Sequence, residues 1–338
     1  MINRSYRLPA PTIRLLLAAL TLLILASCGT VAEPVPAPGA THDDRDPEAI
    51  LAAAERIPTA ARWFEVVKLP NRVYALWEPG HAEKVNSFLI LGSERDVLYD
   101  TGMGIASIGA AILDVRRAEN LPDRELMVIN SHNHLDHNAG NTDFDEAWII
   151  EDAWGIAKLT GGLPAGGDGA FVPYWDQLTP HSGIKTPDDF DPQAFSIPPF
   201  PRENIRFLAD GDIVDLGDRQ FKVIHTTAHS PDGLALYDEK SKIFFGGDTF
   251  IGASFLIRDL ELLASDLERA SRLEIQYHYS SHGAQLIEVM MSGRHLAIVR
   301  RMIAGERTEG ETVFAGATLP LFELDGVQVI EAGDFLTY

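Results

Sequence analysis

The chain has 338 residues, of which 46% are hydrophobic and 23% charged, and its formal net charge at pH 7 is −21. This composition is typical of a soluble globular protein that is large enough for one big domain or two ordinary ones. Because binding to nucleic acid needs clustered Lys and Arg, the acidic balance argues against a nucleic-acid partner. The single cysteine, Cys28, excludes a disulfide within the chain.

The first residues have the pattern of an export signal. Arg4, Arg7 and Arg14 precede an apolar run over residues 15–26. This run is too short to cross a bilayer comfortably, but its length suits the apolar region of a signal peptide. The run ends in Leu-Ala-Ser-Cys at 25–28, which resembles the bacterial lipobox, where the Cys is lipidated and becomes the first mature residue. We therefore expect a lipoprotein signal peptide over 1–27; an ordinary secretory signal or an uncleaved anchor is the alternative.

The residues after Cys28 indicate where the lipid anchor would hold the protein. Gly29 stands where an Asp would resemble an inner-membrane retention signal, which favours the outer membrane, facing the periplasm of the cell envelope. Residues 28–47 are rich in Pro and predict a tether. Residues 48–338 are then expected to form the folded domain.

The first half of this domain reads as strands followed by helices. A helix is predicted over 47–61. Short β-branched and aromatic segments then predict an antiparallel meander, and the remaining elements are two helices and two buried strands. The predicted strands are 63–67, 73–77, 87–91, 96–99, 126–129 and 148–150, and the predicted helices are 105–119 and 151–159. Residues 161–202 are dense in Gly, Pro and aromatics, which predicts a long irregular segment that either serves function or decorates the domain edge.

The second half repeats the same order. Strands are predicted at 212–216, 221–225, 234–237, 243–245 and 274–279, helices at 259–272 and 285–305, and three final strands near 311–315, 319–323 and 327–330. Strands followed by helices, twice over, predict two packed sheets with helices outside. The expected fold class is therefore α+β, a four-layer αββα sandwich.

Four potential metal ligands fall within six residues, directly after the buried strand at 126–129. They are His132, His134, Asp136 and His137. Imidazoles and a carboxylate this close repel when charged and lose hydration, and a divalent cation is the usual compensation. A polar loop that is rich in His by chance is the alternative.

Three further candidates lie downstream, and each follows a predicted strand. They are His229, Asp248 and His282. A rigid sheet can aim such side chains while the loops that carry them stay open to solvent. We therefore expect all seven side chains to meet at one edge of the sandwich.

These motifs resemble those of the metallo-β-lactamase superfamily over roughly residues 63–283. The matching motifs are His-x-His-x-Asp-His at 132–137, Thr-x-x-His-Ser-Pro at 226–231, Gly-Asp at 247–248 and Ser-His-Gly at 281–283. The resemblance implies that residues 48–338 form a metallo-β-lactamase-fold hydrolase domain. It also implies that Asp100, in Asp-Thr-Gly at 100–102, supports the site from behind the ligands.

The resemblance further implies how the ligands divide between two metals. One metal takes His132, His134 and His229, the other takes Asp136, His137 and His282, and Asp248 bridges both. Iron-using redox members of this superfamily tend to replace a motif His with an acid. Since this chain keeps the His residues, two Zn²⁺ ions and hydrolysis are favoured, and iron or manganese stays open.

The expected chemistry follows from the charge of the metals. Bound Zn²⁺ lowers the pKa of water to about 7. The nucleophile would be a hydroxide that bridges the two metals, and Asp136 would orient it and relay its proton to the leaving group. His81 and Glu83 lie on an early hairpin that often borders this family's cleft, so each is a candidate for substrate contact or else a surface residue. Tyr277 and Tyr279 are candidates for polarising a substrate carbonyl, or else ordinary strand aromatics.

The family's name suggests antibiotic hydrolysis, but the ligands favour another reaction. The lactamases closest in motif lack the bridging Asp, and others use a Cys ligand that this chain cannot supply. The expected function is therefore a zinc-dependent hydrolase acting on an ester, lactone or related small molecule. Activity as a β-lactamase, thioesterase or phosphodiesterase is the alternative within enzymes, and a catalytically silent metal-binding envelope lipoprotein is the alternative outside them. The substrate, the native metal and the oligomeric state stay open.

Overall fold

A computed structural model describes residues 46–164, 175–252, 254–289, 293–314 and 317–333. These residues belong to one unit that spans 44–338. The predicted signal peptide, Cys28 and all but the end of the predicted tether lie outside the described residues. Within them, no helix combines the length and the apolar character needed to cross a membrane.

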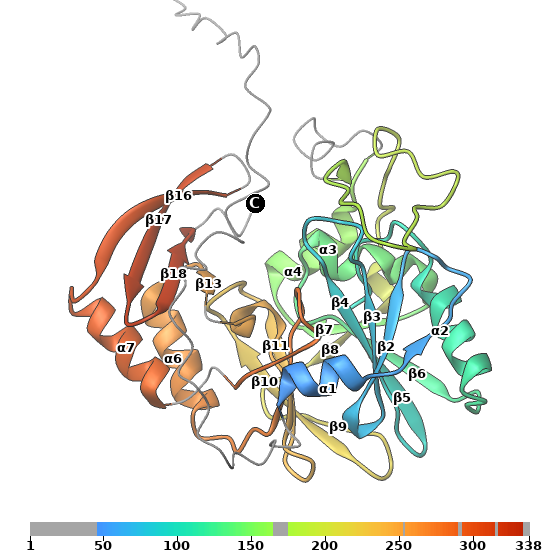
Figure 1. Ribbon diagram of the computed structural model, residues 1–338, viewed down its shortest axis with the longest axis horizontal. Helices are drawn as coiled ribbons and strands as arrows, with labels where there is room; N and C mark the ends of the chain where they lie inside the picture. The colour runs from blue at the N-terminus through green and yellow to red at the C-terminus, as the bar shows by residue number, and fades with distance from the viewer. Residues whose placement is uncertain (1–45, 165–174, 253, 290–292, 315–316, 334–338) are drawn as a thin grey trace, which may run out of the picture. The chain divides into compact units, whose positions relative to one another are not determined.

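The first sheet has eight strands that lie side by side in chain order (Figure 1). The strands β1 to β5 pair antiparallel, as the predicted meander requires, and β5 to β8 pair parallel. Their bounds are β1 (Arg56–Ile57), β2 (Glu65–Leu69), β3 (Val73–Trp77), β4 (Asn86–Ile90), β5 (Arg95–Tyr99), β6 (Glu125–Ile129), β7 (Ala147–Ile150) and β8 (Ile205–Leu208).

The second sheet has six strands in the order β15-β14-β12-β11-β10-β9. Only the pair of β12 and β14 is parallel among its described pairings. The bounds are β9 (Ile213–Asp215), β10 (Gln220–Thr226), β11 (Gly233–Asp238), β12 (Ile243–Phe245), β14 (Tyr277–Tyr279) and β15 (Leu286–Ile287). A smaller sheet follows, in the order β13 (Ser254–Ile257), β18 (Val327–Glu331), β17 (Ala317–Leu324) and β16 (Thr308–Phe314).

Most helices lie on the outer faces of the two large sheets, while the short helix α1 (Pro47–Ala53) packs against the core between them (Figure 1). The helix α2 (Ile108–Ala118) begins at Ser107, whose side chain accepts from the backbone N–H of Ala110, and its apolar face packs on the first sheet. The helices α6 (Leu260–Ala270) and α7 (Gly293–Ile303) pack on the second sheet and on the small sheet. The remaining helices are α1 (Pro47–Ala53), α3 (Leu135–Asn138) and α4 (Ala153–Gly161).

Side chains of both large sheets alternate between the layers they face. On β12, Phe245 points into the core between the sheets, and its neighbour Phe244 points toward α6 and α7. Phe245 packs against Phe88 of the first sheet and stacks on Tyr279 of the second. The helix, sheet, sheet, helix order confirms the predicted αββα sandwich.

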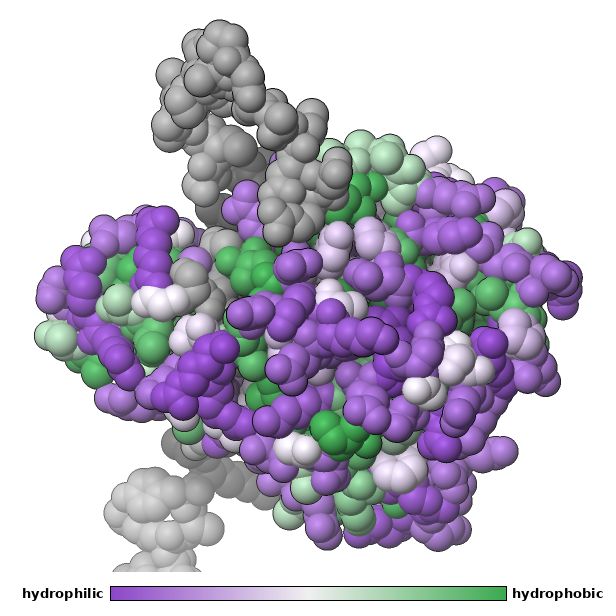
Figure 2. Space-filling model, turned by 90° about the horizontal axis from the view of Figure 1, so that it is seen from below, coloured by the Kyte–Doolittle hydropathy of each residue, from purple (hydrophilic) through white to green (hydrophobic). Residues whose placement is uncertain are grey.

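The surface of the described residues is mainly polar, because most large apolar side chains are buried in the core. Few large apolar side chains of the described residues are exposed, and the face in Figure 2 is mainly hydrophilic, with small and separate hydrophobic areas. The exposed ones are Leu113, Leu178, Ile213, Val289 and Val313.

Two predicted helices are wrong in part. The helix expected over 47–61 ends at Ala53, because Ala54 takes an extended conformation and Arg56–Ile57 pairs with β2. The helix expected over 285–305 begins only at Gly293, since Leu286–Ile287 pairs with β14 and covers the open edge of that strand. The spacing of apolar residues in the sequence did not distinguish the short strands at 56–57 and 286–287 from helix. The strands β8 and β13 were not predicted.

The aromatic contacts of Phe245 lead to a test of the core. Replacing Phe245 by Ala should lower the free energy of unfolding by about 3–5 kcal/mol, because the side chain is fully buried and its loss leaves a cavity. Urea denaturation followed by circular dichroism measures this change. The control, Leu113→Ala on the exposed face of α2, should change it by less than about 1 kcal/mol. Equal losses in the two variants would contradict the packing described here.

Candidate metal centre

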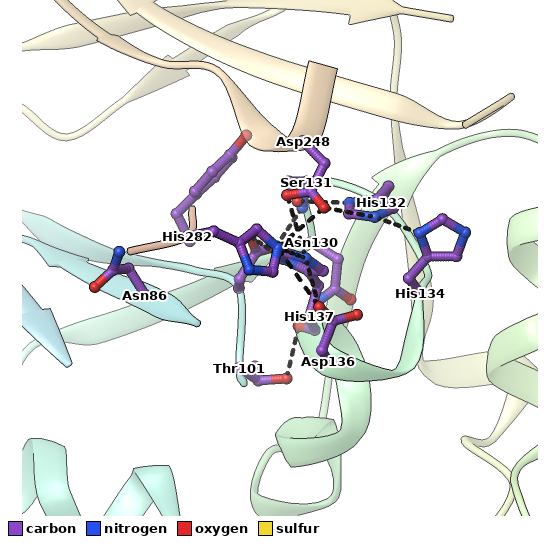
Figure 3. A network of polar contacts seen from close by, with 12 residues as sticks. Asn86, Thr101, Asn130, Ser131, His132, His134, Asp136, His137, Asp248 and His282 are labelled. Atoms are coloured by element: carbon purple, nitrogen blue, oxygen red, sulfur yellow. Dashed lines mark hydrogen bonds and ion pairs between the residues drawn. The ribbon is translucent and has the colours of Figure 1, made fainter. Parts of the chain in front are cut away.

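The seven predicted ligands come from loops at the ends of strands in both large sheets. His132 and His134 follow β6, and Asp136 and His137 lie in the short helix α3. The other three ligands come from the second half of the chain: His229 follows β10, Asp248 follows β12 and His282 follows β14. Figure 3 shows six of the seven converging, with Asp248 between His132 and His282.

The first group consists of three histidines. His134 Nδ1 lies 2.8 Å from His132 Nε2 and 3.0 Å from His229 Nε2. The three rings meet nearly edge to face, with interplanar angles of 82°, 84° and 87°. Three ring nitrogens therefore face one shared point.

The second group combines two carboxylates with two histidines. His282 Nε2 lies 3.3 Å from His137 Nε2 and 3.0 Å from Asp248 Oδ2. The Oδ2 atom of Asp136 lies 3.3 Å from His137 Nε2 and 3.6 Å from His282 Nε2. In each group, the ligand atoms all lie within 4.8 Å of one another.

Asp248 reaches both groups. Its Oδ2 atom lies 3.9 Å from His132 Nε2 and 3.6 Å from His229 Nε2, while its Oδ1 atom lies 3.3 Å from His137 Nε2. The carboxylate is 8% exposed, and Oδ1 forms no hydrogen bond with the described residues. A buried carboxylate between two sets of imidazoles has the position that a bridging ligand requires.

The outer nitrogens of the rings fix which inner nitrogens are free to bind. His229 Nδ1 lies 2.8 Å from the carbonyl oxygen of Leu256, and His282 Nδ1 lies 2.8 Å from that of Glu83. A carbonyl oxygen only accepts, so each Nδ1 donates and, in a neutral ring, each Nε2 keeps its lone pair. Lone pairs that face one another at about 3 Å repel, and a cation between them removes the repulsion. The residues therefore fit a divalent cation in each group.

The electrostatic environment differs between the groups. Burial holds the pKa of His132 well below its usual value and lowers that of His229, with neighbouring histidines adding to the effect. Both rings are then neutral, which is the form that binds a metal. Burial also acts on His282, but the carboxylate of Asp248 outweighs it and raises the pKa of His282 to about 10. The two carboxylates of the second group thus favour positive charge at its ring nitrogens, which a bound cation can supply in place of protons.

Asp100 supports the second group, where the sequence places it. Its Oδ2 atom lies 2.9 Å from His137 Nδ1, and its Oδ1 atom accepts a hydrogen bond of 2.6 Å from the backbone N–H of Ser131. Asp100 is fully buried and has a positive φ of 64°. The carboxylate therefore orients the His137 ring and holds the start of the His132 loop at the same time.

Two acidic residues lie next to the site, and one of them, Glu78, was not predicted as a functional candidate from the sequence. The Glu78 carboxylate is buried and accepts hydrogen bonds from Trp63 Nε1 at 2.5 Å and from the backbone N–H of Met103 at 2.9 Å. Burial raises the pKa of Glu78 to about 7. Burial and the nearby Asp136 likewise raise the pKa of Glu83 to about 7. No local signal marks Glu78, because its partners come from distant segments.

A buried polar contact ties the loops of the first group together. Asn133 lies between the ligands His132 and His134 in the sequence. Its side-chain amide donates a hydrogen bond of 2.5 Å to the carboxylate of Asp232, three residues after His229. Both side chains are buried, and burial raises the pKa of Asp232 to about 6. Gly155 of α4 lies against this contact, where a Cβ atom would stand 2.4 Å from Asp232 Oδ2. The contact therefore positions the His132 and His229 loops relative to one another.

Of the three predicted substrate-pocket residues, His81 is buried and the two tyrosines lie on the core between the sheets. His81 is buried, and its Nδ1 accepts from the Glu83 N–H at 3.2 Å, which stabilises the hairpin turn. Tyr279 is fully buried in the core and donates its hydroxyl to the carbonyl of Pro70. Tyr277 packs on the same core, near α1. The two tyrosines are ordinary strand aromatics, because alternation along β14 turns both inward. His81 is not a surface residue, and its contact with substrate stays a prediction.

Comparison with known proteins identifies the family. The sequence profile of the metallo-beta-lactamase superfamily matches residues 82–286, more than half of the 338 residues. The chain belongs to the metallo-beta-lactamase superfamily. The matched region contains all seven ligands described above.

Relatives in the superfamily include two curated vertebrate proteins named acyl-coenzyme A thioesterase MBLAC2. The protein of Gallus gallus is 30% identical and that of Homo sapiens 29% identical, in each case over 208 residues that cover 59% of this chain and 70% of the relative. Among solved structures, the sec-alkylsulfatase Pisa1 from Pseudomonas sp. has a TM-score of 0.50 at 13% identity and covers 71% of this chain and 41% of its own. The structural likeness shows the fold alone, while the family match and the curated relatives support a hydrolase of this superfamily.

The contact of Asp100 with His137 leads to a test of the centre. Asp100→Asn should weaken binding of one metal equivalent about 10–100-fold, because it removes the charge that orients the His137 ring. Competition with a chromophoric chelator measures both equivalents separately. The control, Asp145→Asn on the exposed loop after α3, should bind both as the parent does. Unchanged affinity of both equivalents in Asp100→Asn would show that this contact does not support the site.

Proposed function

We propose that this superfamily member is a dinuclear zinc-dependent hydrolase that cleaves an ester, lactone or related acyl bond of a small molecule. The observation that supports it best is the meeting of seven metal-binding side chains in two groups, with the Asp248 carboxylate between them. The three histidines of the first group and the mixed second group both suit Zn²⁺.

The residues of the two groups would hold one cation each, and Asp248 would contact both. Bound divalent cations of this kind lower the pKa of water and stabilise negative charge on a carbonyl oxygen. The chain's own contribution is the fixed position of the ligands. The outer ring nitrogens of His137, His229 and His282 each contact a backbone or side-chain oxygen, as described above, and His132 Nδ1 lies 3.0 Å from the hydroxyl of Ser131.

Asp136 is the side chain that we assign to proton transfer. Burial opposes its ionisation, but the nearby His137 and His282 lower its pKa below the usual range, so it is a carboxylate at neutral pH. Its Oδ2 atom lies between these two rings, at 3.3 and 3.6 Å. A carboxylate at this position can accept the proton of the attacking water and return it to the leaving group.

Among acyl bonds, the comparisons favour a thioester. Both curated vertebrate relatives are named as acyl-coenzyme A thioesterases. A thioester, an ester and a lactone share the electrophilic carbonyl that this site would attack. A β-lactam and a phosphodiester are the alternatives within the fold, and the seven ligands alone do not separate them.

The assignment of Asp136 predicts a loss of turnover without a loss of structure. Asp136→Asn should fold normally and lower kcat about 10²–10⁴-fold on whichever substrate the parent hydrolyses best. The measurement is a hydrolysis panel of esters, lactones, thioesters, phosphodiesters and β-lactams, with the metal content of each sample determined in parallel. The control is the exposed Asp145→Asn.

The panel separates the proposal from its alternatives. If Asp136→Asn retains both metals and has a kcat close to that of the parent, Asp136 does not carry out the proton transfer. Two metal equivalents in the parent without turnover on any of the five classes would instead favour a catalytically silent metal-binding protein.

We further propose that the protein is a lipoprotein of the cell envelope, anchored through Cys28 and facing the periplasm. The apolar run at 15–26 and the Leu-Ala-Ser-Cys that follows it support this proposal. Cys28→Ser should abolish incorporation of a labelled fatty acid in a bacterial host, whereas Ser27→Ala should keep it. Labelling of the Cys28→Ser protein, or none of the parent, would contradict the anchor. Separation of inner and outer membranes by density then locates the labelled protein.

A further inference from the structure

An acidic side chain, Asp266, lies on the buried face of α6. This face packs Leu263 and Leu267 into the core beneath the second sheet and the small sheet, and Asp266 is buried with them, with 4% of its surface exposed. A carboxylate is rarely buried without a partner, because it loses its hydration. Within the described residues Asp266 forms no ion pair, and Arg269, three residues further along α6, pairs with Asp210 instead.

The hydrogen-bond partners of this carboxylate are two backbone groups directly before the ligand His229. The Oδ2 atom of Asp266 accepts a hydrogen bond of 2.7 Å from the backbone N–H of Thr227 and one of 2.8 Å from that of Ala228. Hydrogen bonds to an ionised acceptor are roughly twice as strong as those between neutral groups. Asp266 therefore holds the two residues that lead from the end of β10 to the metal ligand.

The carbonyl side of the same two residues is held by Arg258, directly after β13. The backbone N–H of Arg258 donates a hydrogen bond of 2.6 Å to the carbonyl oxygen of Ala228, and its Nη1 atom donates one of 3.4 Å to that of Thr227. All four backbone polar groups of Thr227 and Ala228 thus have partners in the protein. The loop between β10 and His229 is therefore clamped between α6 and the end of β13.

The position of the His229 ring follows from this clamp. Its Nδ1 atom lies 2.8 Å from the carbonyl oxygen of Leu256, two residues before Arg258, so β13 holds both the ring and the loop. Its Nε2 atom lies 3.0 Å from His134 Nδ1, at the point that the first group shares. A shift of the loop would move Nε2 away from that point.

We propose that Asp266 is a positioning residue of the first metal group, which raises the affinity of that group for its metal by fixing the loop that carries His229. The inference rests on the metal centre of the proposed function and adds to it a residue on a helix outside the ligand loops. The second group is supported instead by the contact of Asp100 with His137. The effect of Asp266 should therefore be confined to one of the two metals.

Binding of Zn²⁺, measured for each equivalent by competition with a chromophoric chelator, tests this role. His229→Ala identifies the equivalent that belongs to the first group, because it removes one ligand of that group. Asp266→Leu removes the oxygen acceptor, and Asp266→Asn keeps an oxygen without the charge. Glu261→Gln, on the exposed side of α6, is the matched control for a lost acid. Met302→Ala, fully buried on α7, is the control for lost packing.

We expect Asp266→Leu to weaken the first-group equivalent about 10–100-fold and the second less than about twofold. Asp266→Asn should weaken the first equivalent about threefold, because a neutral oxygen binds the two N–H groups less strongly. Glu261→Gln should match the parent. Met302→Ala should lower the melting temperature of the metal-free protein and keep both affinities within about twofold of the parent, because it leaves the loop in place.

Two results would overturn the proposal: equal weakening of both equivalents in Asp266→Leu, or an unchanged affinity of the first equivalent. If Asp266→Leu does not fold, Asp266→Asn decides by the same comparison of the two equivalents. The test does not use turnover. A parent that binds two Zn²⁺ but hydrolyses none of the five substrate classes would therefore contradict the proposed function alone, whereas a parent that binds no Zn²⁺ would contradict both.

Discussion

Ring nitrogens that point at one another across about 3 Å in a buried place are the constraint on which this structure depends. His134 Nδ1 stands 2.8 and 3.0 Å from the Nε2 atoms of two other histidines, and the outer nitrogen of His229 is occupied by a carbonyl. Such an arrangement is unfavourable by itself, because each ring has been desolvated and the lone pairs repel. The surrounding loops are shaped to hold it. The capacity to bind a cation is therefore set by the way the loops hold these side chains together.

The sheets explain why the loops can hold this arrangement. Every ligand follows a strand or lies within a short turn after one, so the buried core aims the side chains. Phe245, three residues before Asp248, packs against both sheets. Asp100 and the Asn133–Asp232 pair then fix the remaining freedom of the loops. Rigid packing below and hydrogen bonds behind the ligands together preorganise the site.

The ligands and the layers could be predicted from the sequence, while most of their surroundings could not. The motif at 132–137 and the strand ends before His229 and Asp248 carry local signals, and the structure brings them together. Glu78 carries no such signal, since its partners Trp63 and Met103 become neighbours only on folding. The strand at Leu286–Ile287 was also missed, because it forms by pairing with the open edge of β14 although its sequence has helical periodicity. The side chain of Tyr279 points into the core because of its position in β14, which the sequence alone did not show.

Each ligand group draws on both halves of the chain, which makes a bound cation a cross-link. The contact of His134 with His229 closes 95 residues of chain, and that of His137 with His282 closes 145. Closing loops of this length removes conformational entropy from the unfolded chain, much as a disulfide does. The only cysteine is Cys28, so no disulfide within the chain can serve this purpose. Metal loading would thus act as the cross-link that the sequence otherwise lacks, and chelation would loosen the two halves together.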